Sequence, residues 1–326
     1  MDNETSLLNV VDLKKYFYLP AGVLGLTKTE VKAVDDISFD IKRGETLGLV
    51  GESGCGKSTT GRTILQLYRP TSGSVFFDGI EIQKLNSREL HPLRTRFQMV
   101  FQDPYASLNP RHSVKRIVSE PLVIHNLMHG KDLDDRVVEL LELVGLNPAY
   151  MNRFPHEFSG GQRQRIMIAR ALSVKPDFLV CDEPISALDV SIQAQVVNLL
   201  QNLQEQLNVA YLFITHDLRM VKHISHRIAV MYLGKVMELA KRSALFDSPL
   251  HPYTRFLMSA VPLPNPRVER SKQRLILKGE PPSPAHPPTG CVFHPRCPIA
   301  TEVCKSEIPE LKEYGVGHFA ACHHII

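Results

Sequence analysis

A glycine-rich run at residues 51–58 constrains this chain more than any other feature. The run reads Gly-Glu-Ser-Gly-Cys-Gly-Lys-Ser, follows an apolar stretch at 46–50 and precedes a helix-like stretch at 57–66. A strand, a glycine-rich turn and a helix in this order aim backbone N–H groups and the positive end of a helix at one point. The pattern predicts a loop that binds a nucleoside triphosphate. A flexible loop with an incidental lysine is the competing interpretation.

The residue types of this loop suit the parts of a magnesium–triphosphate complex. We expect Lys57 to reach the β- and γ-phosphates and Ser58 to hold Mg²⁺. The other residues expected to line the phosphates are Gly51, Ser53, Gly54, Cys55, Gly56 and Thr59.

Two adjacent acids, Asp182 and Glu183, follow a second apolar strand predicted at 177–181. Acids at the end of a strand that opens on a crevice suit a metal–phosphate site. We expect Asp182 to help position Mg²⁺ through water and Glu183 to polarise the attacking water as general base. An acid pair that faces solvent is the alternative.

Ser159, Gly160, Gly161 and Gln162 open another predicted helix, at 162–172. Glycines and a serine cap at the start of a helix predict a second anion site. Because one γ-phosphate needs only one such cradle, the second suggests a nucleotide held by another copy of the fold.

Short apolar strands alternate with helix-like segments up to residue 240, which predicts an α/β layered domain. Two continuous apolar runs, at 178–181 and 211–214, are typical of a parallel sheet covered on both faces. The strands predicted from the pattern are residues 8–13, 34–41, 46–50, 96–101, 177–181, 210–215, 227–232 and 235–239.

Helical periodicity predicts a helical insert, about 104–170, within a nucleotide-binding domain of residues 1–245. Proline-rich stretches then predict a linker region over 246–290. A small cysteine-rich module over 291–326 follows it.

Charge and hydropathy argue against several classes of protein. A formal net charge of +4, without a long block of Lys or Arg, favours a solvated mixed surface over nucleic-acid binding. No apolar run reaches the length that spans a bilayer, and the polar first residues are unlike a secretory signal. We therefore expect a cytoplasmic protein, one that can still dock on a membrane protein.

Six motifs resemble, in order and spacing, those of the ATP-binding cassette (ABC) transporter ATPases. They are the phosphate loop, Gln102 after a strand, the signature at 159–162, the acids at 182–183, residues 186–189 and His216. A closer resemblance, over nearly the whole chain, is to the ATPase subunits of oligopeptide and dipeptide importers (OppF- or DppF-type). It rests on residues 50–59, 101–111, 251–254 and the C-terminal cysteines.

The resemblance implies a P-loop NTPase fold in which two ATPase domains meet head to tail. Each ATP then lies between the phosphate loop of one domain and the signature of the other. Ser159 and Gly161 would therefore contact the γ-phosphate held by the partner. Gln102 would touch Mg²⁺ and the attacking water, and His216 would hydrogen-bond the γ-phosphate and orient Glu183.

Two further roles come from the resemblance. An aromatic residue would stack on adenine; Phe17 fits that role and Tyr16 is the close alternative, while an ordinary core aromatic near a strand end is the competing interpretation. Asp189 would cross the dimer interface, with a helix N-cap as its competing role.

The same resemblance implies ATP hydrolysis that powers the import of di- or oligopeptides, by a peripheral subunit at the cytoplasmic face of the inner membrane. The implied partners are a second homologous ATPase, two integral membrane permease subunits and, indirectly, a substrate-binding protein, with no nucleic acid. A soluble cassette ATPase of DNA repair or translation is the alternative, although a single cassette without sustained heptads fits it poorly. Nickel or another small solute is an alternative cargo.

Four of the six cysteines lie within a short stretch, with the spacing C-x₅-C-x₆-C-x₁₇-C; they are Cys291, Cys297, Cys304 and Cys322. This spacing is unlike the C-x₂₋₄-C pairs of zinc fingers and ribbons. Four thiolates suit Zn²⁺ or a [4Fe–4S] cluster, and the resemblance favours the cluster. A site without metal, or a mixed site with nearby histidines, stays open.

Overall fold

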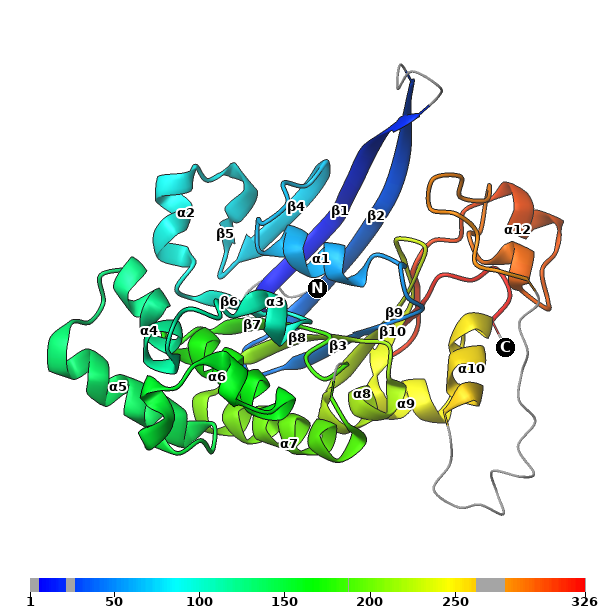
Figure 1. The fold of residues 1–326 in the computed structure, drawn as a ribbon. Helices are drawn as coiled ribbons and strands as arrows, with labels where there is room; N and C mark the ends of the chain where they lie inside the picture. Colours follow the sequence, from blue (N-terminus) through cyan, green and yellow to red (C-terminus); the bar gives the residue numbers. More distant parts are fainter. Residues whose placement is uncertain (1–5, 22–26, 187, 262–278, 326) are drawn as a thin grey trace, which may run out of the picture. The chain divides into compact units, whose positions relative to one another are not determined.

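In a computed structural model of the protein, the structure describes residues 6–21, 27–186, 188–261 and 279–325 (Figure 1). The chain divides into two compact units. The first consists of Met1–Leu7, Ile41–Thr46 and Asp78–Ile214, and the second of Leu8–Asp40, Leu47–Phe77 and Thr215–Ile326. Both units contain strands and helices, which confirms the expected α/β class.

The sheet of the first unit is parallel. Its strands lie in the order β8-β7-β6, with the bounds Ala210–Thr215, Phe178–Asp182 and Phe97–Val100. Phe178 pairs with Phe97 on one side and with Ala210 on the other. Every residue of β7 and β8 is buried, as expected for continuous apolar strands in a covered parallel sheet.

Helices make up most of the first unit. The helices α4, α5 and α6 pack on one another through buried apolar side chains such as Val118, Leu140 and Ile168. Residues 104–172, all of them described, contain helices and no strand, as the sequence predicts for the insert. The elements of this unit other than its sheet are β5 (Ile80–Glu81), α2 (Ser87–Leu93), α3 (Pro104–Ser107), α4 (Val114–Ile124), α5 (Gly130–Leu143), α6 (Gly160–Leu172), α7 (Val190–Leu207) and the 3-10 turns Ile82–Lys84, Pro148–Asn152 and Pro155–Glu157.

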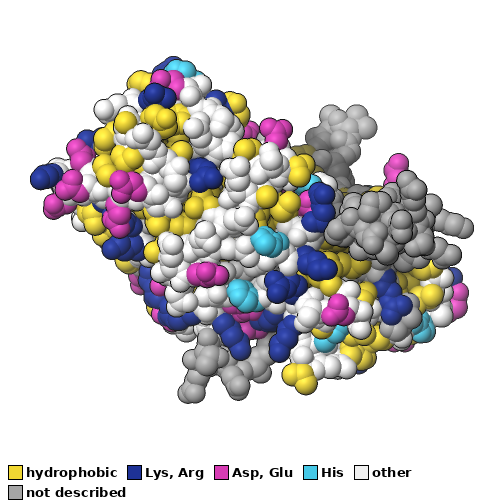
Figure 2. Space-filling view, turned by 90° about the horizontal axis from the view of Figure 1, so that it is seen from below, with side chains coloured by type: hydrophobic (Ala, Val, Ile, Leu, Met, Phe, Trp, Pro, Cys, Tyr) yellow, Lys and Arg dark blue, Asp and Glu magenta, His cyan; other side chains and the backbone are white. Residues whose placement is uncertain are grey.

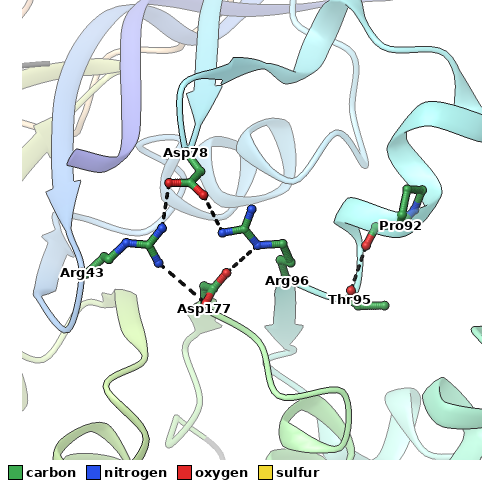
Figure 3. Close-up of polar contacts among 6 residues, drawn as sticks. All are labelled: Arg43, Asp78, Pro92, Thr95, Arg96 and Asp177. Carbon is green, nitrogen blue, oxygen red and sulfur yellow. Dashed lines mark hydrogen bonds and ion pairs between the residues drawn. The ribbon is translucent and has the colours of Figure 1, made fainter. Parts of the chain in front are cut away.

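Four charged side chains form a ring in the first unit (Figure 3). Arg96 donates from Nε to Asp177 at 2.6 Å and from Nη2 to Asp78 at 2.7 Å. Arg43 completes the ring, with Nη2 2.7 Å from Asp78 and Nη1 3.8 Å from Asp177. The hydrogen bond from Arg96 holds the pKa of Asp78 below its ordinary value. The ring ties the segments that precede β6 and β7 to two turns of the same unit.

The strands of the second unit belong to two sheets. In one, its strands lie in the order β11-β12-β10-β9-β3, in which β3 and β9 are parallel and the other pairs are antiparallel. In the other, the long strand β1 lies between β2 and β4. The bounds are β1 (Ser6–Ala21), β2 (Thr27–Lys42), β3 (Thr46–Val50), β4 (Ser72–Phe77), β9 (Arg227–Tyr232), β10 (Lys235–Lys241), β11 (Lys312–Gly315) and β12 (His318–Ala320). The strands predicted at 46–50 and 227–232 are confirmed, whereas the sequence pattern misses β4, β11 and β12.

The C-terminal part differs from the expectation of a linker followed by a separate module. The region 246–290 contains helix α10 (Pro252–Ala260), and its residues 262–278 lie outside the described residues. A separate cysteine-rich module is not supported, because β12 pairs with β10 and so extends the sheet of the second unit. Among the described residues of this unit, the other helical elements are α1 (Lys57–Ile64), α8 (Leu218–Ile224), α9 (Arg242–Asp247), α12 (Glu302–Ser306) and the 3-10 turn His294–Arg296.

Figure 2 shows side chains of every type on one face of the molecule. Lys and Arg side chains are interspersed there with acidic, polar and hydrophobic ones. Within the described ranges, no helix combines the length and the apolarity that a membrane span requires.

Candidate functional site

The phosphate loop of the second unit runs from the end of β3 to the start of α1. Gly56 has a φ of +106°, and a Cβ at this position would lie 1.9 Å from the carbonyl oxygen of Ala33, so only glycine fits. A Cβ on Gly51 would lie 2.1 Å from the carbonyl oxygen of Met231. The two glycines therefore let the loop pass close to β2 and β9.

Lys57 is the first residue of α1 and is 4% exposed. Its Nζ donates to the carbonyl oxygens of Gly51 and Glu52, both at 2.9 Å, so the ammonium lies inside the loop. Gly56 occupies the N-cap and brings no side chain to accept the first N–H groups of the helix, which favours an anion there. Burial raises the pKa of the Cys55 thiol, so the thiol adds no negative charge beside the phosphates.

The acid pair of the first unit follows the expected strand. Asp182 is fully buried at the end of β7, and Glu183 has a left-handed φ of +45°. The Glu183 N–H donates to the carbonyl oxygen of Ile214 at 2.9 Å. Gln102 Nε2 donates to Glu183 Oε2 at 2.8 Å, although 81 residues separate the two. The structure thus brings together two of the predicted site residues.

The signature residues start α6, as the sequence predicts. Ser159 Oγ accepts from the Gln162 N–H at 3.3 Å, and Gln162 Oε1 accepts from the Ser159 N–H at 3.0 Å. This reciprocal capping box fixes the start of the helix at Gly160. A Cβ on Gly161 would lie 2.5 Å from Cγ2 of Ile192, so a larger residue would force α6 and α7 apart.

Asp189 and His216 both lie just outside regular elements. Asp189 occupies the N-cap position of α7, but its side chain makes no capping hydrogen bond, so capping does not occupy the carboxylate. His216 is exposed after β8, and the next residue, Asp217, accepts from the Arg219 N–H at 2.8 Å to cap α8.

The two aromatic candidates on β1 have different surroundings. The Tyr16 hydroxyl donates to Asp35 Oδ1 at 2.5 Å, and burial together with this carboxylate raises the pKa of Tyr16. Phe17 packs edge-on against Tyr68, with ring centroids 5.5 Å apart, and Lys15 Nζ lies 4.9 Å from the Phe17 centroid. The Tyr16 ring is tied by its hydroxyl, which favours Phe17 as the ring for stacking.

The four C-terminal thiols influence one another. Burial raises the pKa of Cys291 to about 11, with added repulsion from Cys304, Cys322 and Cys297. Burial also raises the pKa values of Cys297 and Cys322. In the part of the chain that the structure describes, no group of three or more His, Cys, Asp or Glu side chains is placed to hold a metal ion. The structure therefore does not support the expected [4Fe–4S] cluster or its zinc alternative.

The predicted residues are divided between the two units. The phosphate loop, Phe17 and His216 belong to the second unit, and Gln102, Ser159, Asp182, Glu183 and Asp189 belong to the first.

Sequence reasoning missed two residues that contact the phosphate loop. Tyr253 Oη accepts from the Glu52 N–H at 3.0 Å, and Arg296 Nη1 lies 2.8 Å from Glu52 Oε2. The motif at 251–254 contains the first of them, but no local signal points to Arg296, which is 244 residues from Glu52.

Two similar proteins decide the family. The oligopeptide transport ATP-binding protein AppF of Bacillus subtilis (strain 168) is 55% identical over 322 residues, which are 98% of each chain. The putative oligopeptide transport ATP-binding protein YkfD of the same organism is 56% identical over 318 residues, 97% of this chain and 95% of the other. This chain belongs to the ABC transporter ATP-binding family. Both relatives are named for transport, so the alternative of a cassette ATPase in DNA repair or translation is not favoured.

Family descriptions and solved structures agree with this assignment of the ABC ATPase. Residues 34–186 match the ABC transporter family, and residues 237–304 match the oligopeptide/dipeptide transporter C-terminal region. The dimeric post-hydrolysis structure of the ATP-binding cassette MJ0796 bound to ADP and Pi has a TM-score of 0.63 at 30% identity, over 72% of this chain and 98% of that one. CbiO1 from Clostridium perfringens has a TM-score of 0.64 at 29% identity, over 75% and 92%. The chain has the ABC P-loop fold and is an ATPase of this family.

Proposed function

We propose that this ABC ATPase powers the import of peptides through a membrane transporter. The observation that carries the proposal is 55% identity, over 98% of the chain, to a protein named for oligopeptide transport. The match of residues 237–304 to an oligopeptide/dipeptide transporter region supports the same cargo. Nickel or another small solute as cargo has no comparable support.

ATP binding is assigned to the phosphate loop. We expect the backbone N–H groups of the loop, the Lys57 ammonium and the start of α1 to offset the negative charge of the phosphates. Phe17 is proposed to stack on adenine, with Tyr16 as the alternative. A stacked ring binds a base without reading its edges, so selectivity among bases is expected to be weak.

The residues proposed for Mg²⁺ have suitable chemistry. Ser58, Gln102 and Asp182 offer hydroxyl, amide and carboxylate oxygens, which are the hard ligands that Mg²⁺ prefers. A bound Mg²⁺ offsets charge on the β- and γ-phosphates.

Hydrolysis requires a water molecule aligned with the γ-phosphorus. We propose that Glu183 accepts a proton from this water as the water oxygen bonds to phosphorus. The bond from the γ-phosphorus to the bridging oxygen breaks, which leaves ADP and phosphate. The 2.8 Å hydrogen bond from Gln102 to Glu183 supports a role for Gln102 in orienting the carboxylate. His216 is proposed to hydrogen-bond the γ-phosphate.

A second ATPase protomer is proposed to complete the site. Ser159 and Gly161 of the partner would contact the γ-phosphate, and Asp189 would cross the interface. The position of these residues at the start of α6 supports this role, because the positive end of the helix dipole favours an anion. We propose a homologous but different subunit as the partner.

The other proposed partners are two permease subunits in the membrane and, indirectly, a substrate-binding protein. The subunit would act at the cytoplasmic face of the inner membrane, with the helical insert of the first unit as the docking region. The transport function in the names of the relatives supports this arrangement.

The [4Fe–4S] cluster on the four C-terminal cysteines stays a proposal drawn from the family resemblance alone. Analysis of iron and acid-labile sulfide after anaerobic purification tests it. Brown protein with stoichiometric iron and sulfide would support the cluster, and colourless protein with zinc or no metal would reject it.

Uptake of labelled peptides tests the proposed function. Cells that lack this chain are expected to lose the uptake of labelled di- or oligopeptides, and to regain it with the wild-type chain but not with Lys57→Ala. Intact peptide uptake together with lost nickel uptake would contradict the proposed cargo.

A further inference from the structure

We propose that Tyr253 and Arg296, together called the loop clamp, position the phosphate loop and thereby set the affinity for ATP. The proposal rests on the assignment of this loop to ATP, and all of its contacts lie within the second unit. It gives a role to the His-Pro-Tyr sequence at 251–253, which the hydrolysis mechanism does not use.

The His-Pro-Tyr sequence places Tyr253 by starting helix α10. His251 Nδ1 accepts from the Tyr253 N–H at 3.0 Å, and Pro252 occupies the first turn, where its missing N–H costs no hydrogen bond. The Tyr253 ring is fully buried against Tyr232 and Phe293, with centroid distances of 4.8 and 5.3 Å. Close packing leaves the ring few alternative positions, so its hydroxyl is fixed 3.0 Å from the Glu52 nitrogen.

Arg296 reaches the same loop residue from the C-terminal part of the chain. Its side chain is 8% exposed, and Nη1 lies 2.8 Å from Glu52 Oε2 and 3.4 Å from the Tyr232 hydroxyl. Its buried Nε has no hydrogen-bond partner among the described residues. Because the guanidinium is largely removed from water, loss of its carboxylate partner would leave a buried charge unpaired, which costs more than breaking an exposed ion pair.

Three groups of Glu52 are therefore held by hydrogen bonds or an ion pair. Its N–H donates to Tyr253, its carboxylate pairs with Arg296, and its carbonyl oxygen accepts from Lys57 Nζ at 2.9 Å. The third contact joins the clamp to the ammonium that is expected to meet the phosphates. A clamp that fixes Glu52 orders the loop in advance and so reduces the conformational entropy lost when ATP binds.

The loop segment that the clamp holds borders a cavity. Residues 52–55 border a cavity of about 540 Å³, whose other lining residues are 232–233 and 280–284. Ser53 and Gly54 are exposed. Where few apolar contacts hold a backbone segment, directed polar contacts decide which conformation it keeps.

Nucleotide titration of Arg296→Met tests the loop clamp in the full chain. We expect the Kd for a fluorescent ATP analogue, and the KM for ATP in the assembled transporter, to rise about tenfold, the size expected for a lost charge-assisted hydrogen bond. The kcat should change less than about twofold, because the loop clamp does not touch the reacting atoms. Arg296→Lys keeps a cation opposite Glu52 and should restore most of the affinity.

Tyr253→Phe tests the other half of the loop clamp, since it removes only the acceptor of the Glu52 N–H. We expect the Kd for the ATP analogue to rise roughly threefold or more. In the double variant with Arg296→Met, the free-energy cost of ATP binding should be less than the sum of the two single effects, because both residues hold Glu52. Should Arg296→Met fail to fold, an unchanged Kd in Tyr253→Phe would overturn the proposal.

Arg227→Met is the matched control. Arg227 pairs with Asp40 at 3.0 Å, with side chains 18% and 13% exposed, at the end of β9 that is remote from the phosphate loop. This variant should lower the melting temperature and leave the Kd unchanged. An unchanged Kd in Arg296→Met, or equal Kd increases in both arginine variants, would overturn the loop clamp. A wild-type chain that binds no ATP would instead overturn the assignment of the loop to ATP.

Discussion

Glu183 combines two features that an ordinary acid at the end of a strand lacks. Its φ of +45° lies in the left-handed region, which costs a residue with a side chain about 1–2 kcal/mol. Two hydrogen bonds hold it there, one from its N–H to Ile214 and one from Gln102 to its carboxylate. Such strain persists where the surrounding structure enforces it, and it concentrates at functional sites.

Glu183→Gln is therefore expected to abolish turnover while ATP still binds. Removal of the general base should lower kcat by about 10²- to 10⁴-fold and trap a closed ATP-bound dimer. Phosphate release by the reconstituted complex, measured beside nucleotide binding, checks this. ATPase activity close to that of the wild type would contradict the role of Glu183.

His251 makes the stability of the folded chain depend on pH. Burial lowers its pKa to about 3, and its neutral Nδ1 caps α10. The unfolded chain takes up a proton as the pH falls below about 6.5, whereas the folded chain does not until about pH 3. Stability therefore falls as the pH is lowered between these values, by up to about 1.4 kcal/mol per pH unit.

His251→Asn isolates this contribution, because Asn also caps helices but does not titrate. Between pH 7 and pH 5, the drop in the free energy of unfolding should be smaller in the variant by about 2 kcal/mol. Urea denaturation at the two pH values measures it. An equal drop in the free energy of unfolding in the wild type and the variant would show that His251 is not buried in its neutral form.

At the scale of elements, the ring of Arg43, Asp78, Arg96 and Asp177 links the segments that start the parallel strands. Arg96→Gln should lower the free energy of unfolding at pH 7 by about 1 kcal/mol, a modest value because the side chains are partly exposed and screened by solvent. Arg96 lowers the pKa of Asp78, so this stability is present above the ordinary Asp pKa and is lost as the pH falls below it.

The difference in the free energy of unfolding between the Arg96→Gln variant and the wild type should therefore shrink as the pH falls below the ordinary Asp pKa, because Asp78 takes up a proton in the unfolded chain before it does so in the folded chain. Arg43→Gln is the control: it removes one contact of 2.7 Å and one of 3.8 Å, so its effect should be smaller. A stability difference that persists unchanged at pH 3 would argue against an electrostatic origin.

The strands differ in how well the sequence pattern of their own residues predicts them. Burial on both faces gives β7 and β8 continuous apolar runs, so the pattern alone finds them. β12 has only three residues, and β4 starts with Ser72 and Gly73, so pairing with β10 and β1 decides these strands instead.

The contacts of the candidate site also differ in how well the sequence predicts them. The strand, loop and helix around Lys57 are local in sequence and were predictable from spacing. The contact of Gln102 with Glu183 spans 81 residues, and only the order of family motifs suggested that the two act together. The contact of Arg296 with Glu52 spans 244 residues and depends on the fold of the C-terminal part, so neither spacing nor motif order reveals it.

At the scale of the whole molecule, the proposed function requires more than this chain. The family resemblance assigns Lys57 and Ser159 to opposite sides of a nucleotide shared by two protomers. Binding of ATP would then favour the closed pair, and hydrolysis would remove the shared γ-phosphate and let the pair open. We propose that this cycle moves the permease subunits.

Transport by the assembled complex in proteoliposomes measures the coupling of ATP hydrolysis to peptide movement. We expect ATP hydrolysis to accelerate when peptide-loaded binding protein is present, and labelled peptide to accumulate across the membrane only with ATP. Glu183→Gln should abolish both. Peptide accumulation that continues with Glu183→Gln, or ATP hydrolysis that never moves peptide, would contradict this coupling.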